Sequence, residues 1–232
     1  MPVISMISPK GGVGKTTAAT VLATQLASGA KVVVIDADPN RPIAAWASLD
    51  GKPENVTVVS DVTEENIIDK IDDAAATAPF VIVDCEGTAS LTVAYAIGAA
   101  DLVIIPTQGS QLDAKQAARA LSLIRNQEKQ ARRQIKHRIL LTRTNPVIKP
   151  RTLSNITSQF AEAGVEVMET QLNEREAFRA MFSFGGGLRQ LDATQVANID
   201  KAEANARAFV TEIIDILRAP VRGRNVTEGD GQ

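Results

Sequence analysis

The stretch SPKGGVGKTT, residues 8–17, follows a short apolar run and precedes a segment whose apolar residues have helical spacing. A strand, a glycine-rich turn and a helix in this order form a phosphate-binding loop, in which backbone N–H groups turn inward around phosphate oxygens. The usual pattern is G-x-x-x-x-G-K-S/T, and Pro9 stands at the position of its first glycine. Such a loop needs only Lys15 to hold a phosphate, so the second lysine, Lys10, requires its own explanation.

The residues of this loop have separate expected roles. The glycines let the backbone approach the phosphates, Lys15 can reach the β- and γ-phosphates, and the hydroxyl of Thr16 can ligate Mg²⁺. We therefore predict that a nucleotide phosphate and Mg²⁺ bind here. The predicted binding residues of the loop are Lys10, Gly11, Gly12, Val13, Gly14, Lys15, Thr16 and Thr17.

Short, nearly continuous apolar runs recur along the chain, and such runs are typical of strands buried on both faces of a parallel sheet. The predicted strands are residues 3–7, 32–35, 80–83, 102–105 and 139–141, with 56–59 and 165–167 as further candidates. Predicted helices cover residues 16–28, 64–76, 111 to about 133, 153–163, 174–184 and about 199–217. This alternation predicts an α/β fold: a doubly wound, mostly parallel sheet flanked by helices.

Composition limits the class of protein further. We expect residues 1–219 to form one domain and residues 220–232, VRGRNVTEGDGQ after Pro220, to be a disordered tail, because they hold no core-forming pattern. A single cysteine excludes a disulfide framework or a C-x-x-C metal site, and no apolar run approaches the roughly 20 residues of a membrane span. Since nothing at the N-terminus resembles a signal peptide, a cytoplasmic location is expected.

The motif Lys10-Gly11-Gly12-Val13-Gly14-Lys15-Thr16 resembles that of the deviant Walker A ATPases, the ParA/MinD family. The extra lysine is that family's signature lysine, which reaches across a dimer interface to the partner's nucleotide. The resemblance implies that Lys15 serves the nucleotide of its own subunit and Lys10 that of its neighbour. It also implies ATP with Mg²⁺ as cofactors and a homodimer that forms on ATP.

Two further segments match the family in order and spacing. Residues 33–39, VVIDADP, resemble its A′ motif, which implies that Asp38 orients the attacking water and that Asp36 supports the metal shell. Residues 80–84, FVIVD, resemble Walker B, in which the final acid, Asp84, holds Mg²⁺. For each acid taken alone, capping of the following helix is the alternative explanation.

The resemblance thus assigns catalysis to Lys10, Lys15 and Asp38, and metal binding to Thr16, Asp36 and Asp84. It places recognition of the base near residues 142–145, with Asn145 as a contact, and in the loop before Glu174. Gln108 falls in the stretch where the family has a switch on the γ-phosphate side. The chain departs from the family after Asp84, where D-C-E-G replaces D-x-P.

Charge is distributed unevenly along the chain. Residues 36–86 hold twelve Asp or Glu against three Lys or Arg, whereas residues 115–153 hold eleven Lys or Arg against one acid, Glu128. On one continuous helix the basic side chains would span an arc of roughly 140°, and we interpret this face as a contact surface for double-stranded DNA without sequence preference. A solvated helix face is the alternative. The candidate DNA-binding residues are Lys115, Arg119, Arg125, Lys129, Arg132 and Arg133.

The basic face agrees with what the resemblance implies: a DNA partitioning ATPase of the small ParA type, which dimerises on ATP, binds DNA and releases it after hydrolysis. The resemblance implies a centromere-binding, ParB-like partner and nucleoid association in the ATP state. Residues 36–42 with Trp46, and residues 173–178, resemble the VirC-type branch, so assembly of a conjugative DNA-transfer complex stays open. A MinD-like membrane-positioning ATPase and a small-molecule ligase of the same fold are rivals. Stable membrane association is not expected, because the last helix carries Glu212 and Asp215.

Overall fold

Parallel strands form the centre of the structure, a computed structural model that describes residues 1–87, 90–147 and 151–220. The strands are β1 (Val3–Met6), β2 (Val32–Ala37), β3 (Val56–Val59), β4 (Phe80–Cys85), β5 (Leu102–Thr107), β6 (Lys136–Thr144) and β7 (Leu172–Asn173). They form a seven-stranded, all-parallel sheet in the order β3-β2-β4-β1-β5-β6-β7. Because β4 and β5 lie on opposite sides of β1, the loop after β1 sits at the crevice where such sheets bind ligands.

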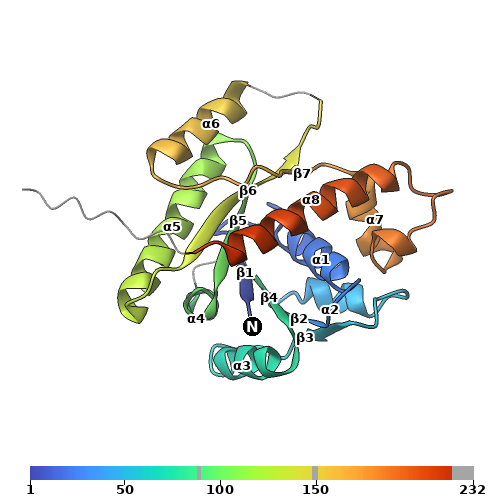
Figure 1. The fold of residues 1–232 in the computed structure, drawn as a ribbon, viewed down its shortest axis with the longest axis horizontal. Helices are drawn as coiled ribbons and strands as arrows, with labels where there is room; N and C mark the ends of the chain where they lie inside the picture. Colours follow the sequence, from blue (N-terminus) through green and yellow to red (C-terminus); the bar gives the residue numbers. More distant parts are fainter. Residues whose placement is uncertain (88–89, 148–150, 221–232) are drawn as a thin grey trace, which may run out of the picture.

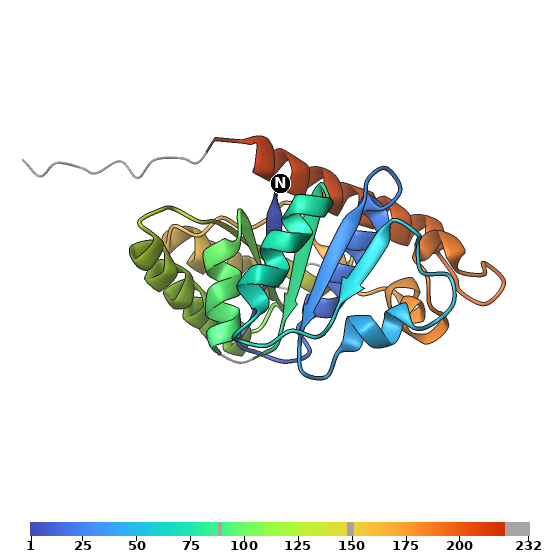
Figure 2. The same cartoon turned by 90° about the horizontal axis from the view of Figure 1, so that it is seen from below.

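Helices cover both faces of this sheet (Figure 1 and Figure 2). One layer, which shares a core with the sheet, is α1 (Lys15–Leu26), α2 (Pro42–Ala47), α7 (Glu176–Phe184) and α8 (Ile199–Arg218). The other is α3 (Ile67–Thr77), α4 (Leu91–Ala99), α5 (Gln111–Ala131) and α6 (Arg151–Glu162). Alternate residues of each strand contribute to the two cores, as Val32 and Val34 do to one and Val33 and Ile35 to the other. The predicted fold class is confirmed.

The structure corrects some boundaries. The predicted strand at residues 165–167 was wrong: Val167 makes one isolated bridge to Ile139, and β7 is the edge strand instead. The chain then bends at residues 169–170, whose N–H groups donate to Glu212 of α8. The helices α2 and α4 were not predicted, since both are short and rich in alanine without a clear amphipathic pattern.

The C-terminal residues fall partly outside the described structure. The predicted tail at 220–232 lies there except for Pro220. Within the described residues, none of the helices combines the length and the apolar character that crossing a membrane would require.

Candidate active site

The loop between β1 and α1 has the backbone that its glycines predict. Gly12 and Gly14 have φ of 74° and 94°, a left-handed region that glycine adopts without strain. Helix α1 begins at Lys15, and among the described residues no side chain caps it. Its first N–H groups therefore remain available to an anion, and the helix dipole favours one. The hydroxyl of Thr142 donates to the Val13 carbonyl at 2.7 Å and anchors the loop to β6.

The side chain of Lys15 folds back onto the start of its own loop. Lys15 is only 6% exposed, and its Nζ donates to the backbone carbonyl of Lys10 at 3.3 Å. A buried ammonium at the head of a helix raises the local positive potential where phosphate oxygens would lie. The Nε2 of Gln108 donates to the Gly12 carbonyl at 3.1 Å, so the residue predicted to belong to a switch contacts the phosphate loop.

Two carboxylates face the start of α1 from neighbouring strands. Asp36 and Asp84 are paired in register on β2 and β4 and are 1% and 0% exposed. The hydroxyl of Thr16 donates to Oδ2 of Asp84 at 2.7 Å. Burial raises the pKa of Asp84 to about 7; the hydrogen bond from Thr16 opposes this shift and the charge of Asp36 adds to it. Burial also raises the pKa of Asp36.

One oxygen of each carboxylate is left without a protein partner. Within the described residues, the buried Oδ1 atoms of Asp36 and Asp84 have no hydrogen-bond donor. Unpaired buried carboxylate oxygens are costly unless a cation or water satisfies them. Hard oxygen ligands beside a phosphate loop fit Mg²⁺, which is typically held through few carboxylates, water and phosphate oxygens. Thr16, Asp36 and Asp84 therefore lie together as a metal site would require.

Asp36 has a structural role as well. Its Oδ2 accepts the backbone N–H groups of Ile43 and Ala44, both at 2.8 Å, and so holds the first turn of α2. One oxygen of Asp36 thus caps α2, while the other has no hydrogen-bond donor among the described residues and is available to a cation. Asp38, two residues on, is half-buried, and its Oδ1 accepts from the backbone and the side chain of Asn40 at 2.9 and 3.0 Å.

A glycine explains part of the departure after Asp84. A Cβ at Gly87 would lie 3.0 Å from the backbone nitrogen of Gly11 and 3.2 Å from the carbonyl carbon of Lys10. Only glycine fits so close to the phosphate loop without displacing backbone. This contact joins the segment after β4 to the peptide between Lys10 and Gly11.

A cavity of about 270 Å³ continues from the phosphate loop toward α7. It is lined by Gly14, Thr17, Thr142, Arg143, Leu172, Asn173, Glu174, Arg175, Phe178, Arg179 and Phe182. Residues 142–143 and the residues before Glu174, where the base is predicted to bind, line this cavity, whereas Asn145 is not among the lining residues. The sequence analysis missed Phe178 and Phe182, whose spacing of four places them on one side of a helix and could have indicated them.

Four of the six basic candidates lie on α5, and Arg132 and Arg133 follow its end. All are exposed, but α5 ends at Ala131 and Arg132 has a left-handed φ of 49°, so the predicted helix to about 133 was too long. The Arg133 guanidinium donates to the carbonyls of Gly98 and Ala100, which end α4. An open hollow before β6 is lined by Arg125, Lys129, Arg132 and Arg133 together with the acid Glu128 and Gln134.

Comparisons with known proteins agree with this geometry. The model of the VirC1 protein family matches residues 1–219. A protein named ParA from Rhizobium radiobacter is 42% identical over 222 residues, which cover 94% of this chain and all of the relative. A virC1 protein from Rhizobium rhizogenes is 28% identical over 225 residues, covering 94% of this chain and 96% of the relative.

Among solved structures, apo McdA from Cyanothece superimposes with a TM-score of 0.76 at 17% identity, covering 92% of this chain and 99% of that one. At that identity the likeness concerns the fold alone.

Proposed function

Because this chain belongs to the VirC1 family, a branch of the small ParA-type ATPases, we propose that it binds ATP with Mg²⁺ and hydrolyses it to control its attachment to DNA. The observation that carries the proposal is the Thr16–Asp84 hydrogen bond beside two unpaired carboxylate oxygens at the head of α1. Lys15 and the first N–H groups of α1 hold the phosphates, and Thr16, Asp36 and Asp84 hold the metal. The cavity beside α7 takes the base.

Asp38 is the residue assigned to the attacking water. It follows β2 at the carboxyl edge of the sheet, and the two hydrogen bonds from Asn40 fix the orientation of its carboxylate. A carboxylate held in this way accepts a hydrogen bond from water and directs the oxygen toward the γ-phosphate. Bound Mg²⁺ supplies charge neutralisation on the phosphate oxygens.

Lys10 acts on the nucleotide of a second subunit in the proposed ATP-dependent homodimer. This assignment rests on the family's signature lysine and on the position of Lys10 at the start of the loop, directly against Gly87. Since each nucleotide would then contact both subunits, ATP binding and dimerisation are coupled, and hydrolysis separates the two protomers.

The proposed DNA surface is centred on Arg125, Lys129 and Arg132, and Lys115 and Arg119 extend it toward the start of α5. The described structure shows Arg133 hydrogen-bonded to α4, so we assign it to positioning the end of α5 as well. Contacts of this kind go to phosphates and carry no sequence information, so binding is nonspecific and falls steeply with salt. The protein would be cytoplasmic, and on the nucleoid in its ATP state.

A ParB-like centromere-binding protein is the proposed partner that stimulates hydrolysis and carries the cargo DNA. The match to the VirC1 family favours a second candidate for the cargo, a conjugative DNA-transfer complex. The two candidates share the nucleotide cycle and differ in the DNA site that the partner recognises.

The test is binding to a random-sequence duplex with ATP, ADP or no nucleotide across a salt series, with anionic liposomes in parallel. Binding that requires ATP and weakens steeply with salt is expected. ATP-dependent capture by liposomes without DNA binding would replace the proposal with a MinD-like function. Failure on both surfaces would point to a small-molecule enzyme.

Lys15→Ala tests the nucleotide site itself. Removing the buried ammonium should lower ATP affinity at least about 100-fold and abolish phosphate release, because charge-assisted contacts to phosphate are among the strongest in such sites. Titration calorimetry and a phosphate-release assay measure both effects. The exposed Lys31→Ala is the control, and normal turnover of Lys15→Ala would disprove the site assignment.

A further inference from the structure

Two polar side chains of α8 hold the backbone of the segment that leads into β7. The side-chain oxygen of Asn205 accepts the N–H of Asn173 at 3.0 Å, and its nitrogen donates to the Gln171 carbonyl at 2.7 Å. The two carboxylate oxygens of Glu212 accept the N–H groups of Glu169 and Thr170, each at 2.7 Å. Four backbone groups of one five-residue segment are therefore satisfied by one helix.

The spacing of these two side chains matches the segment they hold. Residues seven apart lie on nearly the same side of a helix and about 10 Å apart along its axis. Glu212 holds the start of the segment, at residues 169 and 170, and Asn205 holds its end, at residues 171 and 173, so the segment runs antiparallel to α8. Helix α8 thus supplies hydrogen-bond partners at both ends of residues 169–173.

This segment forms one wall of the cavity next to the phosphate loop. Leu172 and Asn173 line the cavity, followed directly by Glu174 and Arg175. The side chain of Asn173 donates to the Thr144 hydroxyl at 2.9 Å and accepts from Arg175 at 3.2 Å. Any shift of the Asn173 backbone therefore moves the cavity wall.

The sheet gives β7 little support of its own. It is a two-residue edge strand whose pairing with β6 is interrupted by a register shift between Thr142 and Thr144. Short edge strands with few ladder bonds are locally weak. The hydrogen bonds from α8 supply the second row of contacts that an edge strand otherwise lacks.

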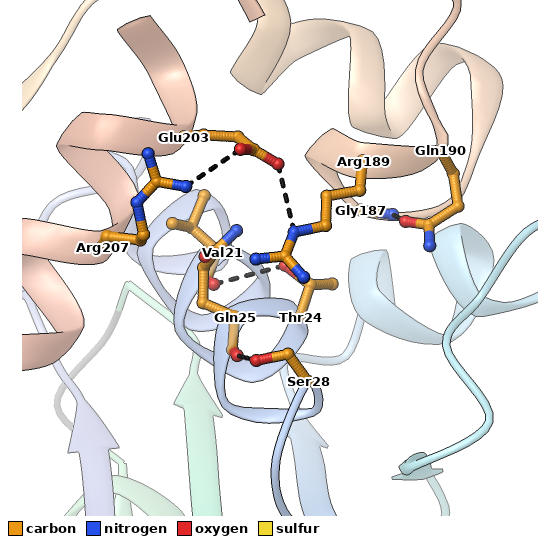
Figure 3. Close-up of polar contacts among 9 residues, drawn as sticks. All are labelled: Val21, Thr24, Gln25, Ser28, Gly187, Arg189, Gln190, Glu203 and Arg207. Carbon is orange, nitrogen blue, oxygen red and sulfur yellow. Dashed lines mark hydrogen bonds and ion pairs between the residues drawn. The ribbon is translucent and has the colours of Figure 1, made fainter. Parts of the chain in front are cut away.

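Helix α8 is itself fixed from its other side. Glu203 lies 200° around the helix from Asn205 and accepts from Arg189 at 3.2 Å and from Arg207 at 3.0 Å (Figure 3). Arg189 belongs to the short 3-10 turn Leu188–Gln190, and α8 also packs against α1, whose N-terminus carries the phosphate loop (Figure 1). Helix α8, which holds the cavity wall, therefore packs against α1, the helix that begins at the phosphate loop.

We propose that Asn205 and Glu212 are positioning residues for the base-binding wall, setting affinity for the nucleoside part of the nucleotide without contacting it. The inference rests on the proposed function, in which the base occupies this cavity. It assigns a role in ligand affinity to two residues of the last helix that lie outside every phosphate-binding motif.

The experiment compares two probes in the presence of Mg²⁺: ATP, which fills the phosphate loop and the cavity, and inorganic tripolyphosphate, which fills the loop alone. Asn205→Leu removes both hydrogen bonds while keeping an isosteric side chain, and Glu212→Gln leaves one acceptor. Asp215→Asn is the matched control, because it removes the same charge from an exposed site three residues away. Asn205→Asp keeps the acceptor for Asn173 and serves as the partial rescue.

Asn205→Leu should bind ATP about 10-fold more weakly and tripolyphosphate as the wild type does, with Asn205→Asp and Glu212→Gln in between and Asp215→Asn unchanged. Equal losses for both probes would show a general structural role and overturn the inference, as would an unchanged ATP affinity. If Asn205→Leu does not fold, the same comparison is decided by Glu212→Gln and Asn205→Asp. A wild type that binds the two probes equally would disprove the base site itself, a failure visible without any variant.

Discussion

Asp84 combines two properties that both disfavour its ionised form: it is fully buried, and among the described residues its Oδ1 has no hydrogen-bond partner. Its raised pKa of about 7 means that between pH 4 and 7 the folded protein keeps a proton that the unfolded chain has released. Stability therefore falls as the pH rises through this window and levels off above it. A cation bound beside Asp84 would favour the ionised form and remove this cost.

Asp84→Asn should abolish that dependence. With EDTA and without nucleotide, the variant should melt at least about 3 °C above the wild type at pH 8 and close to it at pH 4, since each unit of pKa shift corresponds to about 1.4 kcal/mol. Adding Mg²⁺ and ATP should raise the Tm of the wild type and have little effect on the variant. Differential scanning calorimetry across pH measures both, with Asp215→Asn as control; a constant Tm difference at all pH values would contradict the assignment.

Lys10 is the residue whose proposed role extends beyond one subunit. Lys10→Ala should change ATP affinity of the monomer by less than about threefold, because Lys15 and the α1 N-terminus remain. It should lose the dimer that a non-hydrolysable ATP analogue induces. Static light scattering with and without the analogue distinguishes the two species, and Lys31→Ala should dimerise as the wild type does. An intact Lys10→Ala dimer would leave the second lysine without the proposed function.

At the scale of elements, α7 is joined to the loop after α2 by a glycine at its C-terminal end. Gly185 has a φ of 81°, and a Cβ there would lie 2.2 Å from the Asp50 carbonyl oxygen. The indole N–H of Trp46 donates to the neighbouring Gly186 carbonyl at 3.0 Å. Helix α7, which lines the cavity, thus ends in close backbone contact with the loop that follows α2.

Gly185→Ala should therefore destabilise the protein by at least about 2 kcal/mol, the combined cost of backbone strain and overpacking. The matched control is Gly164→Ala, which has the same kind of backbone, φ 70°, but no atom within 4 Å of the added Cβ. Its loss should be only about 1 kcal/mol. Urea unfolding measures both, and equal losses would mean that the contact with Asp50 contributes nothing.

Elements that follow from a local sequence pattern were predicted, whereas features that depend on contacts between distant residues were not. Apolar runs such as residues 80–83 form central strands because burial on both faces excludes other arrangements. The loop motif located Lys15 and Thr16, and strand ends located Asp36 and Asp84. The loop before Glu174 was predicted as part of the base region, but its support by α8 was not, because Asn205 reaches Gln171 and Asn173 from more than 30 residues later in the chain. Long-range contacts of this kind leave no periodic pattern.

On the scale of the whole molecule, the proposed nucleotide site and the basic hollow lie at opposite ends of the sheet. The phosphate loop follows the carboxyl end of β1, whereas Arg125, Lys129 and Arg132 surround a hollow before β6 begins at Lys136, which pairs with the first residue of β5. Substitutions in the basic hollow should therefore leave the proposed nucleotide site unchanged.

Lys129→Glu combined with Arg132→Glu should weaken duplex binding at least about 10-fold at low salt and reduce its salt dependence, with ATP affinity unchanged. Arg133 is excluded from this test because its hydrogen bonds to Gly98 and Ala100 would be lost as well. Fluorescence anisotropy with labelled DNA measures the effect. The exposed pair Lys31→Glu and Lys201→Glu controls for net charge, and unchanged DNA binding by the first pair would return this face to a solvated surface.

The double use of Asp36 has an optical consequence. One carboxylate oxygen holds the start of α2 and the other faces the predicted metal position, and four residues along from Pro42 the same helix carries Trp46, the chain's single tryptophan. The indole is 2% exposed and hydrogen-bonded to the segment that follows α7. Because this single buried indole lies on the helix capped by Asp36 and contacts the segment after α7, we expect its emission to change when ligand binds, which stopped-flow fluorescence can follow without a label.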